Sequence, residues 1–219
     1  MILGLVKIGM NRNKTIVGLT GGSGAGKGEV ARIFKARGAE IIDADKLSHK
    51  VMLRSETAAF ERILETFGEG ILGANGEIDR KKLGAIVFSD KAKLDILAGI
   101  VHEYVAERVL KIIENSEKQV VVIDAPVLIE AGMEKICDFV VGVFAPRDLR
   151  IARICARDGI APEAAEMRLD KQMADDELRL YADFEIYNNG SIKDLRHCVD
   201  VIAASIFGMS TGDSAWGAG

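Results

Sequence analysis

The sequence predicts an α/β protein of three layers, in which a five-stranded parallel sheet lies between helices. Three observations support this expectation. Five short apolar runs of strand length alternate with segments of helical periodicity. Each run is apolar at consecutive positions, which is typical of strands buried on both faces. A chain of 219 residues with 48% apolar content can also bury a large core in one globular unit.

The strands are expected, in chain order, at residues 15–20, 39–43, 119–124, 138–144 and 183–187. Right-handed crossovers between parallel strands place the loops that follow them at one edge of the sheet. Four segments are expected at that edge, namely 20–27, 43–45, 124–126 and 188–190. Polar residues from distant parts of the chain would therefore meet there.

The segment after the first strand has the sequence of a phosphate-binding loop. Gly21, four residues, Gly26 and Lys27 match G-x-x-x-x-G-K, and a helix start follows. Glycines let consecutive backbone N–H groups turn around an anion, and the helix adds the positive end of its dipole. This predicts a P-loop NTP hydrolase or kinase fold, whereas the alternative is a Gly-rich turn without a ligand. The expected nucleotide contacts are Gly22, Ser23, Gly24, Ala25, Gly26, Lys27, Gly28 and Glu29.

One position of this loop departs from the usual pattern. Gly28 stands where a Ser or Thr hydroxyl normally meets Mg²⁺. Mg²⁺ often keeps several waters, so a water can fill the vacant position. Asp124 ends a Val-Val-Val-Ile run as a Walker-B carboxylate does. We therefore predict that the nucleotide binds with Mg²⁺ and that the metal site depends on Asp124.

About 75 residues separate the second and third strands, more than a single crossover needs. Helical periodicity within this gap predicts helices at 47–54, 58–67, 81–87 and 92–116. We expect a helical insertion at 46–117, well placed to bind a second substrate. The nucleotide core of the domain would then be 15–45 with 118–208, preceded by an N-terminal extension at 1–14 and followed by a disordered tail at 209–219.

Composition excludes several classes of function. A net charge of −4 gives no basic footprint for nucleic acid, and no apolar stretch approaches the roughly 20 residues that span a bilayer. The three cysteines, Cys137, Cys155 and Cys198, are too few and too far apart for a disulfide framework or a zinc cluster. We expect a cytoplasmic protein with small-molecule partners. The sequence does not specify its oligomeric state.

Three arginines follow the fourth strand. Arg150, Arg153 and Arg157 lie at i, i+3 and i+7, so a helix carries them on one face, where they repel unless an anion is near. A triphosphate is such an anion, and we expect a lid at about 147–181 that closes over it. The alternative is a solvated basic face, eased by Asp148 and Asp158.

Taken in order, the motifs resemble the dephospho-CoA kinase family from about residue 15 to 206. The resemblance rests on Gly18-Leu-Thr-Gly-Gly-Ser-Gly-Ala-Gly-Lys27, Ile42-Asp-Ala-Asp45, Phe67-Gly, Ile78-Asp-Arg80-Lys-Lys-Leu83, Val87-Phe88, His102, Ala125-Pro-Val-Leu-Ile-Glu130, Arg153, Arg157, Gln172 and Asn188-Asn-Gly190. It implies transfer of the ATP γ-phosphate to the ribose 3′-hydroxyl of dephospho-CoA, the last step of coenzyme A synthesis. It also implies a CoA-binding insertion and a mobile lid.

The resemblance further implies roles for single residues. Asp45 would orient the ribose hydroxyl and accept its proton, while the alternative is an N-cap for a helix that begins at Lys46. Asp43 would then be structural. The remaining catalytic residues would be Lys27, Arg153 and Arg157, Arg150 fitting the pattern less well. Acceptor contacts would come from Asp45, Arg80, His102, Pro126 and Leu128, and Asn188 would join the nucleotide contacts. Glu103 departs from the proline that usually follows the family's histidine.

Two other functions are compatible with parts of the sequence. Gly after the loop lysine also occurs in adenylate kinases, which favours a nucleoside or nucleotide monophosphate kinase. A non-catalytic nucleotide-binding module is the second alternative, because the Glu29 carboxylate would repel phosphate if it pointed into the loop.

Overall fold

The structure is a computed structural model that describes residues 14–55 and 57–211. The expected N-terminal extension therefore lies, except for Lys14, outside the described residues. The chain divides into two compact units, the first comprising 1–42 and 113–219 and the second 43–112. The second unit corresponds to the insertion expected at 46–117.

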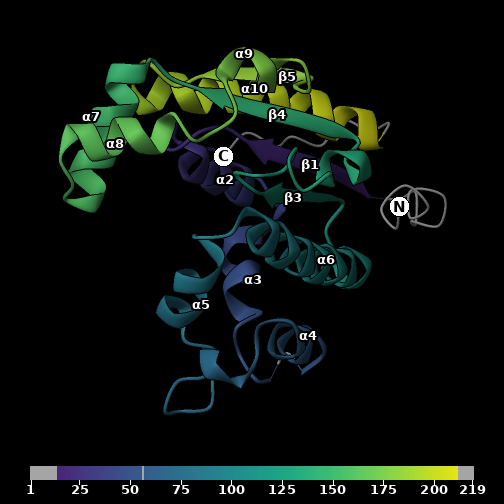
Figure 1. Cartoon of the computed structure of the whole chain (residues 1–219). Coiled ribbons are helices and arrows are strands. Elements are labelled where there is room, and N and C mark those ends of the chain that lie inside the picture. Colours follow the sequence, from purple (N-terminus) through teal and green to yellow (C-terminus); the bar gives the residue numbers. More distant parts are fainter. Residues whose placement is uncertain (1–13, 56, 212–219) are drawn as a thin grey trace. The chain divides into compact units, whose positions relative to one another are not determined.

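The first unit is built on a five-stranded sheet with the strand order β2-β3-β1-β4-β5 (Figure 1). The strands are β1 (Thr15–Thr20), β2 (Glu40–Asp43), β3 (Val120–Asp124), β4 (Phe139–Phe144) and β5 (Phe184–Tyr187). The pairs β1–β3, β1–β4 and β4–β5 are parallel. The α/β fold with a five-stranded parallel sheet is therefore confirmed. Each strand lies within one residue of its predicted start and ends where predicted.

Helices α2 (Lys27–Ala36) and α10 (Ile192–Thr211) cover one face of this sheet. Figure 1 shows α10 running along β4 and β5. Alternate strand residues face these helices, because successive side chains of a strand point to opposite faces. They form one buried apolar cluster with the helices: Val17, Leu19, Val120, Val122, Val141 and Val143 from the strands, and Val30, Phe34, Val199 and Ile206 from the helices. On the opposite face, the 3₁₀ helix η2 (Met133–Ile136) packs beside β1.

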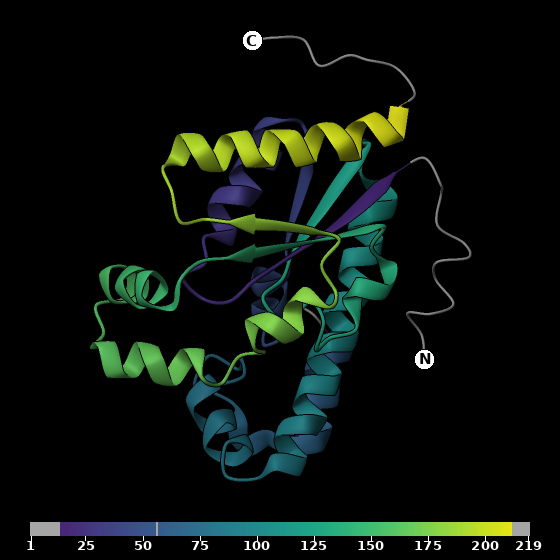
Figure 2. The same ribbon diagram turned by 90° about the horizontal axis from the view of Figure 1, so that it is seen from above.

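Three short helices follow β4: α7 (Arg147–Asp158), α8 (Pro162–Leu169) and α9 (Asp175–Arg179). Figure 2 shows α7 and α8 lying side by side as a helical pair. Ile154, Ala165 and Leu169 form a small apolar cluster between them. Gly159 ends α7 in the left-handed conformation, with φ of 66°, which a residue without a Cβ adopts readily. The expected lid region is thus a helical hairpin followed by a short helix.

The second unit is helical, as the long gap between strands predicts. Its elements are α3 (Ala44–Lys50), α4 (Thr57–Phe67), the 3₁₀ helix η1 (Glu69–Ile71), α5 (Arg80–Val87) and most of α6 (Lys91–Asn115). The first of these helices was expected at 47–54. It begins earlier because the Asp43 side chain accepts a hydrogen bond from the Lys46 amide at 2.9 Å and so caps the helix at Ala44.

The C-terminal helix differs from the prediction at its end. Helix α10 continues to Thr211, whereas a disordered tail was expected from residue 209. The remaining residues of that tail, 212–219, lie outside the described residues. No helix in the part of the chain that the structure describes is long and apolar enough to cross a membrane.

Candidate active site

The phosphate loop joins the end of β1 to the start of α2. Gly24 and Gly26 have φ values of 77° and 103°, in the left-handed region that favours glycine. A Cβ on Gly26 would also lie 2.1 Å from Nδ2 of Asn188. The loop thus needs glycine at both positions, for conformation and for close approach of another segment.

Helix α2 presents its amino terminus to this loop. No side chain caps the helix, whose N-cap residue is Gly26. An uncapped helix start combines unpaired N–H groups with the positive end of the helix dipole, and both favour an anion. The Lys27 ammonium donates to the Gly21 carbonyl oxygen at 2.9 Å, so the lysine folds back along the loop. Backbone and side chain together form a cationic cradle.

Glu29 lies in the first turn of α2, and its carboxylate is engaged by Arg32. The Arg32 Nε donates to Glu29 Oε2 at 2.9 Å. This hydrogen bond, together with the charge of Arg32, holds the pKa of Glu29 below its usual value. The repulsion that motivated the non-catalytic alternative is thereby reduced, because the carboxylate is paired with a cation on its own helix.

Arg150 on α7 lies against the phosphate loop and is buried. Its Nε donates to the Ser23 carbonyl oxygen at 3.0 Å, and its Nη1 donates to Asp175 at 2.9 Å. A Cβ on Gly22 would be 1.9 Å from Arg150 Nη2, which shows how closely the guanidinium approaches the loop. Of the three arginines, this one was expected to fit the site least well.

Gln172, between α8 and α9, binds the same loop. The Ser23 backbone N–H donates to Gln172 Oε1 at 3.0 Å, and Gln172 Nε2 lies 3.0 Å from Ser23 Oγ. Arg150 Nη2 also donates to Gln172 Oε1, at 3.3 Å. The segment after β4 is therefore in direct contact with the loop that the sequence assigns to phosphate.

Arg153 also reaches the loop, from the same face of α7. Its Nη1 donates to the Gly24 carbonyl oxygen at 3.2 Å and its Nη2 to the Asn188 carbonyl oxygen at 3.1 Å. Asn188 follows β5, is buried, and donates from Nδ2 to the Ala25 carbonyl oxygen at 2.8 Å. Arg153 and Asn188 thus meet at the loop although 35 residues separate them.

Arg157, one turn further along α7, has a different environment. It binds Asp158 through Nε at 2.7 Å and through Nη2 at 2.9 Å. Arg168 of α8 donates to the same carboxylate. Hydrogen bonds from Arg157 and Arg168 hold the pKa of Asp158 well below its usual value. In this structure the three residues tie α7 to α8.

Asp124 lies at the carboxyl end of β3, the edge at which the phosphate loop begins. In the parallel register it is paired with Leu19, the residue before the buried Thr20. The described residues contain no group of three or more His, Cys, Asp or Glu that could hold a metal ion. A cation here would need oxygen atoms from its ligand, which is how Mg²⁺ usually binds beside one carboxylate and substrate phosphates. The residues present fit Mg²⁺ in that mode.

Two residues expected to contact the acceptor follow Asp124. The Pro126 carbonyl oxygen lies 3.5 Å from the Thr20 hydroxyl, and the proline is half-buried. Leu128 is fully buried, and a Cβ on Gly18 would lie 2.5 Å from its Cδ2. Its side chain therefore packs against β1. The structure places Leu128 in the core rather than on a binding surface, which corrects that expectation.

The second unit holds the other expected acceptor contacts. Asp45 is exposed in the first turn of α3, and Asp43, not Asp45, is the N-cap. The N-cap alternative for Asp45 was therefore wrong, and the structural role of Asp43 is confirmed. Helix α5 begins at Arg80 because Asp79 caps it through the amides of Lys81 and Lys82. The Arg80 side chain is exposed.

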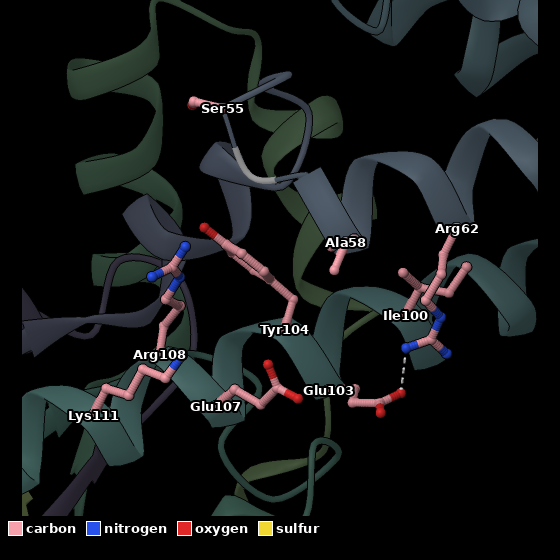
Figure 3. A pocket seen from close by; sticks show the side chains of 10 residues that line it. Ser55, Ala58, Arg62, Ile100, Glu103, Tyr104, Glu107, Arg108 and Lys111 are labelled. Atoms are coloured by element: carbon pink, nitrogen blue, oxygen red, sulfur yellow. Dashed lines mark hydrogen bonds and ion pairs between the residues drawn. The ribbon is translucent and has the colours of Figure 1, made fainter.

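His102 lies half-buried near the middle of α6. A separate cavity of about 280 Å³ opens between α4 and α6 within this unit (Figure 3). Arg62 and Glu103 line it and form an ion pair of 2.7 Å, and the Arg108 guanidinium lies 5.4 Å from the Tyr104 ring centroid. His102 is not among its lining residues, since it lies about 200° around the helix from Tyr104.

Comparison with known proteins identifies the family. The sequence profile described as dephospho-CoA kinase matches residues 15–194, most of the described chain. The chain belongs to the dephospho-CoA kinase family. A dephospho-CoA kinase from Aquifex aeolicus is 41% identical over 179 residues, which cover 81% of this chain and 90% of the relative.

Solved structures agree with this assignment. A dephospho-CoA kinase from Campylobacter jejuni superposes with a TM-score of 0.65 at 33% identity and covers 90% of this chain and 99% of its own. A crystal structure of a protein from Thermus thermophilus gives a TM-score of 0.76 at 31% identity, with 88% of this chain and 97% of the other covered. The resemblance inferred from the ordered motifs is confirmed.

The sequence did not indicate every residue at the loop of this family member. Gln172 belongs to the ordered motifs and was expected on a lid helix that begins near Pro162, but it was not assigned to the site, and Asp175 gave no signal. Helix α8 ends at Leu169, so Gln172 lies in the turn that follows it and Asp175 begins α9. Arg150 did give a signal, because its spacing to Arg153 places both on one helical face.

Proposed function

We propose that this protein transfers the γ-phosphoryl group of ATP to the ribose 3′-hydroxyl of dephospho-CoA. The observation that carries the proposal is the glycine loop at the start of α2, lined by Lys27, Arg150 and Arg153, in a chain of the dephospho-CoA kinase family. Three cations around one turn of backbone N–H groups suit the phosphates of a nucleotide.

The nucleotide half of the reaction belongs to the first unit. The loop residues from Gly22 to Glu29 would surround the phosphates, with Asn188 fixing the loop through the Ala25 carbonyl. Lys27 and Arg153 would neutralise charge that develops as the phosphoryl group leaves ADP. Arg157 would join them when the lid at about 147–181 closes, after leaving its contact with Asp158.

The acceptor half belongs to the second unit. In the proposed step the ribose 3′-oxygen attacks the γ-phosphorus, the bond to the bridging oxygen of ADP breaks, and the hydroxyl proton passes to Asp45. The Asp45 carboxylate makes no hydrogen bond or ion pair within the described residues, so it is available to a substrate. Arg80 and His102 would bind other parts of dephospho-CoA, and Pro126 would contact it from the first unit.

Mg²⁺ would be held by Asp124 together with phosphate oxygens, and it would supply charge neutralisation at the transferred group. Gly28 contributes no side chain to this site. The remaining positions around the ion would therefore be filled by water. The three cysteines form no disulfide in the described part of the chain, which fits the reducing environment of the cytoplasm, where we place the reaction.

The proposal is tested by the release of ADP from Mg²⁺–ATP in the presence of different acceptors. Dephospho-CoA should support turnover, whereas a panel of nucleosides and nucleoside monophosphates should not. Asp45→Asn should reduce kcat by a factor of about 10² or more, since general base catalysis contributes roughly 10²- to 10⁴-fold. The same variant should bind ADP as the parent does.

Two results would contradict the proposal. Turnover with a nucleoside monophosphate and not with dephospho-CoA would make the protein a nucleotide kinase. Full activity of Asp45→Asn would show that Asp45 does not accept the hydroxyl proton, although dephospho-CoA could still be the acceptor. Asp43→Ala is the control, because it removes the neighbouring side chain that caps α3 and should lower stability more than kcat.

A further inference from the structure

The phosphate loop is engaged by a side chain of its own protein. The Ser23 backbone N–H, in the middle of the loop, donates to Oε1 of Gln172 at 3.0 Å. Such N–H groups are the ones that a phosphate-binding loop offers to a phosphate oxygen. The other half of the Gln172 carboxamide, Nε2, lies 3.0 Å from the Ser23 hydroxyl oxygen. One amide group therefore satisfies both the backbone donor and the side chain of one loop residue.

Arg150 completes this arrangement. Its side chain is only 8% exposed, and its guanidinium binds three groups: the Ser23 carbonyl, Gln172 Oε1 and the Asp175 carboxylate. A charge so far removed from water needs a counter-charge, which Asp175 supplies at 2.9 Å. The acceptor oxygen of Gln172 thus lies between a backbone N–H and an arginine, the two kinds of donor that a nucleotide phosphate would use.

We propose that the Gln172 carboxamide is an internal ligand of the phosphate loop, which holds the Ser23 N–H and Arg150 until a nucleotide phosphate replaces it. Asp175 pairs with Arg150 while no nucleotide is bound and so competes with a phosphate for its guanidinium. The inference rests on the proposed binding of nucleotide at this loop. It makes Gln172 and Asp175 positioning residues that set nucleotide affinity, in addition to the proposed catalytic residues.

This arrangement has a thermodynamic consequence. A nucleotide that must displace Gln172 binds with an apparent Kd equal to the intrinsic Kd divided by the fraction of molecules in which the loop is free, so a smaller free fraction gives weaker binding. Removing the carboxamide should therefore tighten binding, although it removes hydrogen bonds from the folded protein. A residue with a purely structural role behaves in the opposite way, because loss of its contacts loosens the site and weakens ligand binding.

The test is the Kd of ADP with Mg²⁺, measured by calorimetry on the full chain. Gln172→Ala should bind ADP about 3- to 10-fold more tightly than the parent, while its melting temperature without nucleotide falls. Gln172→Glu should bind ADP at least about 10-fold more weakly, because a carboxylate retains the acceptor oxygen and gains an ion pair with Arg150. Gln119→Ala, at an exposed glutamine before β3, is the matched control and should bind as the parent does.

Asp175→Asn provides a second, independent variant. It should tighten ADP binding because Arg150 loses its competing carboxylate, whereas Asp176→Asn, which removes a 92% exposed charge in the same turn, should have less effect. Unchanged or weaker ADP binding by Gln172→Ala, or parental affinity in Gln172→Glu, would overturn the proposal. The binding measurements contain ADP and Mg²⁺ but no acceptor. Their outcomes therefore do not depend on whether dephospho-CoA is the substrate.

Discussion

At the residue scale, Gly28 is the position where this chain departs from the common phosphate loop. A Cβ built on Gly28 meets no atom within 4 Å, and the residue lies in the first turn of α2 with an exposed backbone. Nothing in the packing therefore requires glycine here. Packing in the fold therefore does not explain why this position lacks a hydroxyl.

The magnesium requirement should respond to this position. Gly28→Ser adds a hydroxyl and should lower the Mg²⁺ concentration that gives half-maximal turnover, whereas Gly28→Ala, the control, should leave it unchanged. Both variants should be more stable by up to about 1 kcal/mol, because glycine is a poor helix former. Asp124→Asn should raise the requirement. A Mg²⁺ titration of ADP release compares the three, and an unchanged midpoint in Asp124→Asn would falsify its role at the metal.

Several residues of the candidate site could be predicted from the sequence. Lys27, Arg153 and Asn188 were assigned to the nucleotide, and each has a hydrogen bond to the loop backbone. The loop follows a local pattern that can be recognised in one sequence. The contact between Ser23 and Gln172 could not be predicted, because 149 residues separate them and it depends on how the helices after β4 pack.

At the scale of elements, the strands were predicted closely and the first helix of the second unit was not. Strands β1, β3 and β4 are apolar at consecutive positions, a pattern set by burial on both faces. Helix α3 depends instead on which aspartate caps it. Asp43 and Asp45 are equally good N-cap residues by type, and the backbone of Asp43, extended at ψ of 98°, is the one that suits a cap.

The pairing of α7 with α8 leads to a prediction about pH. Asp158 accepts hydrogen bonds from Arg157 and Arg168, which lower its pKa in the folded protein. A group whose pKa is depressed on folding stabilises the protein above its unfolded pKa of 3.8, and this contribution is lost as the pH falls toward the folded value. Asp158→Asn should therefore lower the melting temperature slightly at pH 7 and progressively less below pH 3.8.

The expected effect is small because exposed ion pairs contribute little to stability. Asp170→Asn is the appropriate control, since Asp170, the C-cap residue of α8, forms a separate ion pair of 2.6 Å with Arg147 of α7. Thermal unfolding between pH 3 and pH 7 compares the two variants with the parent. A difference between Asp158→Asn and the parent that stayed constant over this range would show that protonation of Asp158 is not linked to folding.

At the scale of the whole molecule, the long gap between the second and third strands predicted a separate helical unit. The observed unit, 43–112, begins three residues before and ends five residues before the expected insertion of 46–117. The later boundary differs because the carboxyl end of α6 belongs to the first unit, where the Lys14 ammonium binds the Ile113 carbonyl oxygen at 2.5 Å. A continuous helix gives no sequence signal for such a division.

This division predicts that substitutions in the two units affect different substrates. Arg80 lies in the second unit, is exposed, and forms no hydrogen bond or ion pair within the described residues. We expect Arg80→Ala to raise the KM for dephospho-CoA about 10-fold or more, because a hydrogen bond to a charged group contributes about 1.5–3 kcal/mol. The Kd of ADP should stay at the parental value, since the phosphate loop belongs to the first unit.

Lys91→Ala is the control, because Lys91 is also an exposed cation of the second unit and is already paired with Asp95 at 2.8 Å. Steady-state kinetics with each substrate varied in turn, together with ADP calorimetry, measure the two effects separately. A rise in the ADP Kd of Arg80→Ala that matched its rise in KM would mean that this residue serves the nucleotide. The acceptor would then have to be bound by other residues of the second unit, with His102 the next to be substituted.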